Sequence, residues 1–104
     1  MKKLVLIAAL GAAFATPAFA SLELATKSAC TACHAIDKKL VGPSYQEVAA
    51  KSKGNAKAEA MLIAKVKAGG VGTWGQVPMP PNAAVKDADI ATLVKWILAG
   101  AKAK

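Results

Sequence analysis

Three residues with thiol and metal-binding chemistry stand together near the start of the chain. Cys30, Cys33 and His34 form a C-x-x-C-H run. On one helical turn, two thiols with this spacing can each add to a different vinyl group of one porphyrin, and the adjacent imidazole can reach the iron. The run therefore predicts one c-type haem, attached covalently through Cys30 and Cys33 and ligated by His34.

The second axial ligand of such an iron must come from elsewhere in the chain. His34 is the only histidine, and apart from Met1 the methionines are Met61 and Met79. Met61 lies in a helical pattern, where we expect it to fill the core. Met79 stands between prolines in a P-M-P-P run, which fixes φ and lowers the entropy of an open loop. Met79 is therefore predicted as the second ligand, which would close the iron and favour its reduced state.

Other interpretations of these residues stay open. If the methionine leaves, the iron could bind a small molecule, as in a sensor or a peroxidase-like enzyme, although the sequence offers no arginine or second histidine for that chemistry. The C-x-x-C-H run could instead hold zinc or form a thiol redox pair, but it lacks a fourth ligand at suitable spacing and a βαβ context. A structural disulfide between the two cysteines is the remaining alternative.

The first twenty residues have the pattern of a secretory signal peptide. A basic start is followed by an apolar run, and Ala18-Phe19-Ala20 is a small-x-small cleavage signal. An uncleaved membrane anchor is the alternative, but Pro17 and the cleavage signal stand where an anchor should continue. We predict that residues 1–20 are removed and that residues 21–104 form one domain in a bacterial periplasm, which also suits covalent haem attachment.

The mature domain is predicted to be all-α, with four or five helices around the covalently bound haem. Apolar spacing and Ser, Gly and Pro punctuation predict helices over residues 22–32, 44–53, 56–68 and 87–100. The last has the clearest apolar face, formed by Ile90, Leu93, Val94 and Ile97. The Gly- and Pro-rich stretch 69–85 must be a loop, and so long a loop in a small domain is usually functional.

The charge is strongly basic and comes from lysine alone. Fourteen lysines stand against six acidic residues, a formal net charge of +8 at pH 7. A lysine-rich surface can steer a protein towards acidic partners, although it can equally be only solvated. Nucleic-acid binding is not expected, because the lysines are scattered and no arginine or aromatic row accompanies them. Lysines that could rim a docking surface are Lys27, Lys38, Lys39 and Lys51.

Four segments carry a family resemblance that covers most of the mature chain. They are C-T-A-C-H-A-I-D at 30–37, V-G-P at 41–43, G-T-W-G-Q-V-P-M-P-P-N at 72–82 and L-V-K-W-I-L at 93–98. Together they resemble the small bacterial class I cytochromes c of the c-551 and c-552 type. The resemblance implies the compact cytochrome c fold and single-electron transfer in a periplasmic respiratory chain, not enzymatic catalysis.

The resemblance also implies roles for residues around the haem. The Pro43 carbonyl would accept the proton on the far ring nitrogen of the axial histidine, which orients the ring and raises its basicity. The Trp74 indole would donate to a haem propionate, and the Asn82 side chain would donate near the methionine sulfur. Lys65 stands near the propionates where many relatives have an arginine, whose bidentate contact a lysine cannot make.

The last helix and the surface around the haem edge carry further expectations. Trp96 is expected in the core, and Asp87 is expected to cap the helix, because Lys86 stands where relatives often have Ser or Thr. By resemblance the partners are redox proteins, met in brief low-area contacts at the exposed haem edge: a cytochrome bc1-type donor, and a nitrite reductase, terminal oxidase or peroxidase as acceptor. We expect a monomer with no membrane insertion after cleavage.

Overall fold

The structure is a computed structural model that describes residues 18–102. Its elements are α1 (Ala18–Lys27), the short 3₁₀ helix η1 (Cys30–Ala32), α2 (Tyr45–Lys51), α3 (Ala58–Ala68) and α4 (Asp87–Leu98). Within the described range, pairing between extended segments is limited to isolated bridges, so the predicted all-α class is confirmed. The predicted signal peptide falls largely on residues 1–17, which lie outside the described residues.

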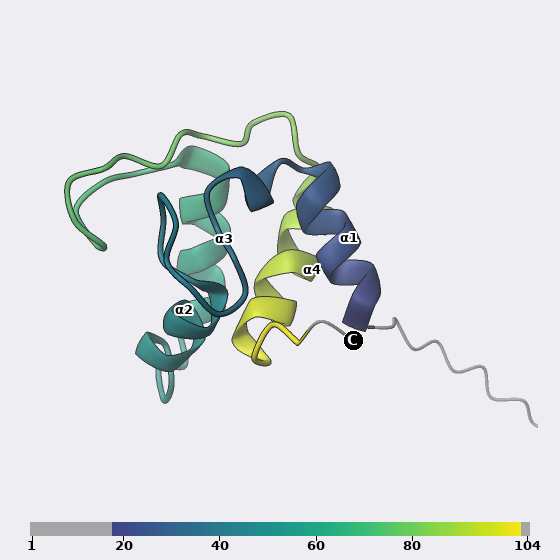
Figure 1. Ribbon diagram of the computed structural model, residues 1–104, viewed down its shortest axis with the longest axis horizontal. Coiled ribbons are helices and arrows are strands. Elements are labelled where there is room, and N and C mark those ends of the chain that lie inside the picture. The colour runs from purple at the N-terminus through teal and green to yellow at the C-terminus, as the bar shows by residue number, and fades with distance from the viewer. Residues whose placement is uncertain (1–17, 103–104) are drawn as a thin grey trace, which may run out of the picture.

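Helix α4 is the element on which the other helices pack. Contacts join it to α1, α2 and α3, and Figure 1 shows it between α1 and α3. Its predicted apolar face is confirmed, because Ile90, Leu93 and Val94 are buried and Ile97 is partly buried. Trp96 is buried as predicted, and its indole Nε1 donates to the Lys102 carbonyl at 3.0 Å. The core therefore forms along α4, the last helix of the described residues.

Helix α2 begins where the sequence predicted. The hydroxyl of Ser44 accepts a hydrogen bond from the backbone N–H of Glu47 at 3.0 Å, and the Glu47 carboxylate accepts one from the Ser44 N–H at 2.9 Å. This reciprocal pair satisfies two N–H groups that the first turn would otherwise leave free. It also places Tyr45, the first residue of α2, in the core cluster with Ala25, Leu93 and Trp96.

The predicted cap of α4 is wrong. The capping position is occupied by Lys86, which makes no side-chain capping bond, and Asp87 is already the first helical residue. Its carboxylate instead forms an ion pair with Lys67, with an Nζ–Oδ1 distance of 2.8 Å. A carboxylate in the first turn still complements the helix dipole, but it leaves the helix without a side-chain cap.

The predicted continuous helix over residues 22–32 is also wrong in detail. Helix α1 ends at Lys27, and Ala29 takes a left-handed conformation with φ 65° and ψ 14° before η1 begins. The tighter turn has a consequence for the cysteines, since side chains three residues apart eclipse one another in a 3₁₀ helix. Cys30 and Cys33, the latter at the end of η1, are thereby presented on one side.

Met61 does not fill the core, contrary to the prediction. Its side chain is 58% exposed on α3. Helix α3 packs against α4, and its less exposed residues include the buried Ala58 and the partly buried Leu62 and Val66, which recur at every fourth position. Met61 stands beside this row, so its helical position does not bring it into the core.

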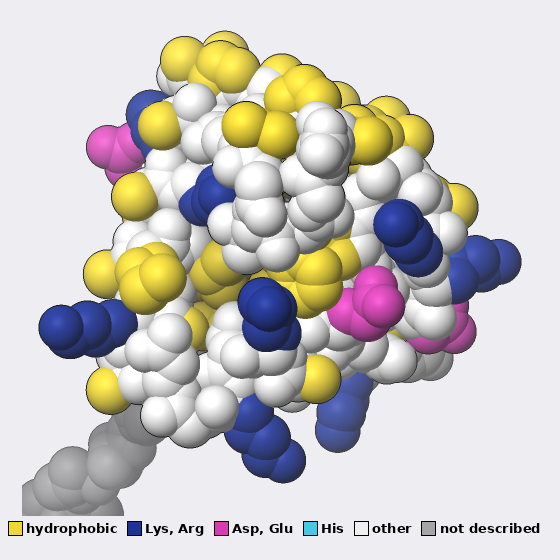
Figure 2. Space-filling model, turned by 90° about the vertical axis from the view of Figure 1, so that its left-hand side faces the viewer, with side chains coloured by type: hydrophobic (Ala, Val, Ile, Leu, Met, Phe, Trp, Pro, Cys, Tyr) yellow, Lys and Arg dark blue, Asp and Glu magenta, His cyan; other side chains and the backbone are white. Residues whose placement is uncertain are grey.

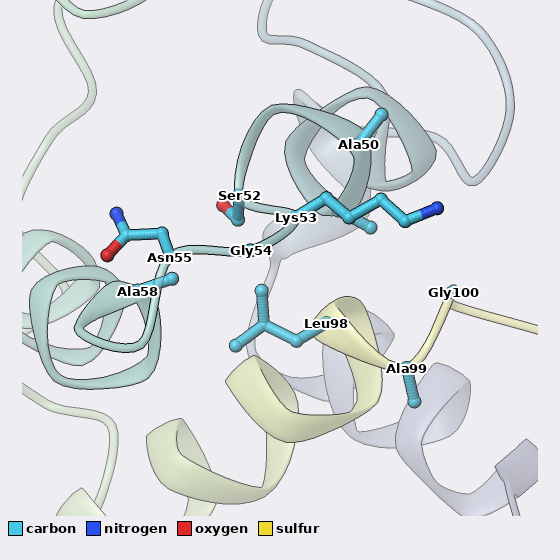
Figure 3. Close-up of a pocket in the computed structure, with 10 residues that line it drawn as sticks. Ala50, Ser52, Lys53, Gly54, Asn55, Ala58, Leu98, Ala99 and Gly100 are labelled. Carbon is cyan, nitrogen blue, oxygen red and sulfur yellow. The ribbon is translucent and has the colours of Figure 1, made fainter.

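The loop between α3 and α4 runs along the edge of the molecule furthest from the end of α4 (Figure 1). Elsewhere, an open hollow of about 460 Å³ lies between the α2–α3 turn and the end of α4, and Figure 3 shows Leu98 pointing into it. Its lining is mostly small residues and contains none of the predicted site residues. No helix in the described range is long and apolar enough to cross a membrane.

Candidate haem site

His34 is held in a fixed orientation by the segment that follows it. Its ring Nδ1 lies 2.8 Å from the Pro43 carbonyl oxygen. A carbonyl can only accept, so Nδ1 must carry the proton, and in the neutral ring Nε2 then has the free lone pair. Gly42 lies against the same ring, since a Cβ added there would stand 2.5 Å from His34 Cε1. The predicted relation between Pro43 and His34 is thus present, and it leaves the imidazole ready to bind a metal through Nε2.

The two cysteines reach the same place from η1. The backbone N–H groups of Cys33 and His34 both donate to the Cys30 carbonyl, at 3.1 and 3.0 Å, which folds the C-x-x-C-H run into one tight turn. Both cysteines are half-buried and free, not joined in a disulfide. Burial raises the pKa of the Cys30 thiol, with a smaller contribution in the same direction from Cys33. Among the described residues, no cluster of His, Cys, Asp or Glu meets the requirements of a metal-ion site.

Tyr45 packs against one face of the His34 ring. The two rings are stacked, with centroids 5.4 Å apart, and Tyr45 meets Trp96 edge to face at 5.2 Å. Burial, above all, raises the pKa of the Tyr45 phenol, so it stays protonated. Its hydroxyl is buried and makes no hydrogen bond to any described residue. The sequence analysis missed the contacts of Tyr45 and Gly42 with the His34 ring; the only signal was that Gly42 belongs to the V-G-P run and that Tyr45 follows it closely.

Met79 is held by backbone pairing with the end of α3. Gly70 N–H donates to the Met79 carbonyl at 3.0 Å, and Met79 N–H donates back to the Gly70 carbonyl at 2.8 Å. Gly69, with φ 75°, ends α3 directly under this pair, where a Cβ would stand 2.4 Å from the Met79 oxygen. The methionine side chain is half-buried. The flanking prolines and this short pairing together give Met79 a defined position in an otherwise irregular loop.

Asn82 attaches the loop that carries Met79 to the end of α3. Its side-chain Nδ2 donates to the carbonyls of Val66 and Pro80, at 3.0 and 3.4 Å. Its backbone N–H donates to the carbonyls of Val66 and Lys67, at 3.2 and 3.1 Å. Since an amide group has two donor hydrogens, both are already engaged. The role beside the Met79 sulfur that the resemblance implies for Asn82 stays a prediction, and the bonds formed here attach the loop to the end of α3.

Lys65 on α3 lies close to the earlier part of the same loop, where Trp74 stands. The Lys65 ammonium donates to Thr73 Oγ1 at 3.1 Å, next to Trp74 in the chain. The Lys51 ammonium stands 5.2 Å from the centre of the Trp74 ring, in a cation–π contact. Trp74 is 39% exposed, so its indole is not in the core. Two positive charges therefore gather around this tryptophan.

Large apolar side chains are exposed around these segments. In Figure 2 hydrophobic side chains follow the upper edge of one face and line a recess in its middle, with lysines around them. The exposed large apolar residues are Leu40, Val41, Met61, Val71, Trp74 and Val77. Five of these six belong to the two segments that carry His34 and Met79, the exception being Met61 on α3. So much apolar surface beside paired thiols, a free imidazole nitrogen and a thioether fits a large apolar metal macrocycle such as haem.

Comparison with known proteins agrees with this fit. The family model of cytochrome c matches residues 22–101. Cytochrome c-551 of Allochromatium vinosum is 61% identical over 84 residues, covering 81% of this chain and 89% of that one. Cytochrome c-551 of Azotobacter vinelandii is 57% identical over 76 residues, covering 73% and 92%. The crystal structure of Nitrosomonas europaea cytochrome c552 superimposes with a TM-score of 0.74 at 46% identity, covering 76% of this chain and 98% of that one.

The fold and the site define a small class I haem protein of the electron-transfer kind, not an enzyme. The chain belongs to the cytochrome c family, with c-551 and c-552 proteins among its relatives. Its cofactor is therefore a covalently attached haem c, and its general partners are redox proteins.

Proposed function

We propose that this chain carries single electrons between respiratory redox proteins in the bacterial periplasm, with haem held by Cys30 and Cys33 and with His34 and Met79 as axial ligands. The observation that carries the proposal is the His34 Nδ1 bond to Pro43 at 2.8 Å. It fixes the tautomer and turns the lone pair of Nε2 away from the backbone. When bound, the haem supplies a one-electron couple at its iron.

The protein's own contribution is to keep both ligands in place. The paired bonds between Gly70 and Met79 and the prolines beside the methionine restrict the loop. The stack of Tyr45 on the His34 ring restricts the other ligand. With two fixed protein ligands little has to move when an electron arrives or leaves, and no coordination position is left for substrate.

The loop around Trp74 is proposed to hold the propionate side of the haem. Lys65 beside Thr73 and Lys51 over the Trp74 ring bring positive charge to that side. The Trp74 indole N–H is proposed to donate to a propionate. The role of Lys65 is electrostatic in this proposal, because an ammonium cannot form the two parallel bonds of a guanidinium.

Docking is proposed at the exposed apolar surface next to the site. Leu40 and Val41 are exposed beside the exposed Lys38 and Lys39. Apolar contact surrounded by positive charge suits a brief, low-area encounter with an acidic redox partner. A cytochrome bc1-type donor and a nitrite reductase, terminal oxidase or peroxidase as acceptor are partners of this kind. The periplasmic location rests on the signal-peptide pattern of residues 1–20.

The test is the visible spectrum of the purified, chemically reduced holoprotein with and without carbon monoxide. Covalent attachment through the two cysteines keeps the haem on the denatured chain, and closure by two protein ligands leaves the reduced spectrum unchanged by carbon monoxide at neutral pH. Prompt carbon monoxide binding would favour a sensor or a peroxidase-like enzyme instead. Loss of the haem on denaturation would contradict covalent attachment through the two cysteines.

A further inference from the structure

The side chain of Lys67 on α3 binds the last residues of the loop between α3 and α4, here called the methionine loop because it carries Met79, and the first residue of α4. Its ammonium donates to the Val85 carbonyl at 2.9 Å and to the Ala83 carbonyl at 3.3 Å. It also pairs with the Asp87 carboxylate, with an Nζ–Oδ1 distance of 2.8 Å. An ammonium has three donor hydrogens, and here each has its own acceptor. The three acceptors lie between the methionine run and the first turn of α4.

These contacts lie directly beyond the bonds of Asn82. The Asn82 N–H and side chain bind carbonyls of Val66 and Lys67 in the last turn of α3. From the same turn, the Lys67 side chain then binds three of the next five residues, Ala83 and Val85 in the loop and Asp87 at the start of α4. The entry of the loop is held separately, by the pairing of Gly70 with Met79. The segment that carries Met79 is thus tied to α3 at both ends.

We propose that Lys67 is a positioning residue for the methionine ligand, which keeps the exit of the loop closed so that Met79 stays on the iron. The inference rests on the proposed function, because it takes Met79 as the ligand. Lys67 touches neither haem ligand in this arrangement and acts only through residues 82–87. Its place in the last turn of α3 is also electrostatically favourable, because a cation there complements the helix dipole.

How strongly Lys67 opposes the opening of the loop depends on which of its contacts are screened by solvent. The Lys67 side chain is 39% exposed and that of Asp87 is 86% exposed, so solvent screens the ion pair and it contributes little. The two bonds from a charged donor to backbone carbonyls carry most of the effect. Their loss should raise the population of the open loop, and with it the apparent affinity for a competing ligand, about tenfold.

The experiment measures how tightly the oxidised holoprotein binds added imidazole, which competes with the methionine. We expect Lys67→Met to bind imidazole about tenfold more tightly than the natural protein, with the haem still attached. Lys95→Met is the matched control: it removes the same charge from an exposed position that makes no side-chain bond among the described residues. Equal imidazole affinities in the two variants would overturn the inference.

A second control separates local opening from general loss of stability. Ile90→Val trims a fully buried side chain of α4 and should lower the global stability of the domain. It should leave imidazole affinity unchanged, and an increase equal to that of Lys67→Met would overturn the inference.

Amide hydrogen exchange gives a readout that does not involve the iron. In Lys67→Met the amides of Met79 and Asn82 should exchange about tenfold faster, while those of α4 keep their rates. Met79→Ala serves as the reference for ligand loss. If Met79→Ala fails to raise imidazole affinity, the ligand assignment is wrong, and exchange alone then decides the role of Lys67: unchanged rates would overturn it.

Discussion

The ring of His34 lies so close to the backbone of Gly42 that an added Cβ would stand 2.5 Å from Cε1 and 2.9 Å from Nδ1. The next residue, Pro43, accepts the hydrogen bond from Nδ1 at 2.8 Å. Two consecutive residues therefore set both the position and the tautomer of the ring. A glycine is needed at the first of them because of contact with the ring, since no positive φ is involved.

Gly42→Ala should move the imidazole and lengthen its bond to the Pro43 carbonyl. Because that bond raises the basicity of the ring, its weakening should raise the midpoint potential, and overpacking should cost about 1–3 kcal/mol of stability. Gly54→Ala is the control: its Cβ meets nothing within 4 Å, but its φ of 80° makes the residue strained. The control should lose stability and keep its potential, as redox titration and denaturant unfolding would show. Equal potentials in both variants would contradict the prediction.

Met79→Ala should leave the haem attached, open the iron and lower the midpoint potential. The physical reason is the loss of a soft thioether that favours the reduced state. We expect a fall of at least about 0.1 V, within the ~0.8 V range that axial ligands span. Met61→Ala is the matched control, because that methionine is exposed on α3. A potential that does not change in Met79→Ala would refute the assignment.

Gly69→Ala should disrupt the base of the methionine loop. A Cβ at this position would meet the backbone of Met79, Pro80 and Pro81 at 2.4 to 2.9 Å, and none of these atoms can rotate away. Together with the positive φ, this should cost about 3 kcal/mol in urea unfolding and increase carbon monoxide binding. Gly72→Ala also has a positive φ but faces open space, and it should cost only about 1 kcal/mol. Similar losses in the two variants would show that the contact with the loop is unimportant.

Lys86→Ser should stabilise the protein. Lys86 has the extended backbone of a helix cap, with φ −64° and ψ 144°, but no capping side chain. A serine hydroxyl can accept from the N–H groups of the first turn, as Ser44 does at α2, and the gain should be about 1 kcal/mol. Lys86→Ala controls for the loss of charge and should give no such gain in thermal or urea unfolding.

The sequence predicted the elements whose signals are local. The spacing of Cys30, Cys33 and His34, the capping pair at Ser44 and the apolar face of α4 all depend on residues within a few positions of each other. The haem followed from the C-x-x-C-H run and the family from the four segments that resemble it, and the comparisons confirm both. The roles of individual site residues remain predictions that the variants above test.

The features that sequence reasoning missed depend on contacts between distant segments. Ala29 has no sequence signal for its left-handed backbone, which is set by how α1 and η1 must join. Met61 has a helical pattern around it, but only the position of α4 decides which row of α3 is buried. Lys67 binds residues 16 to 20 positions away, and Asn82 binds Val66, so neither contact has a local pattern.

The two tryptophans stand in opposite surroundings, so each one reports on a different part of the molecule. Trp74 is 39% exposed on the methionine loop, whereas Trp96 is 6% exposed in the core beside Tyr45. Solvent therefore reaches the Trp74 indole in the folded protein, whereas it reaches the Trp96 indole only when the core itself opens.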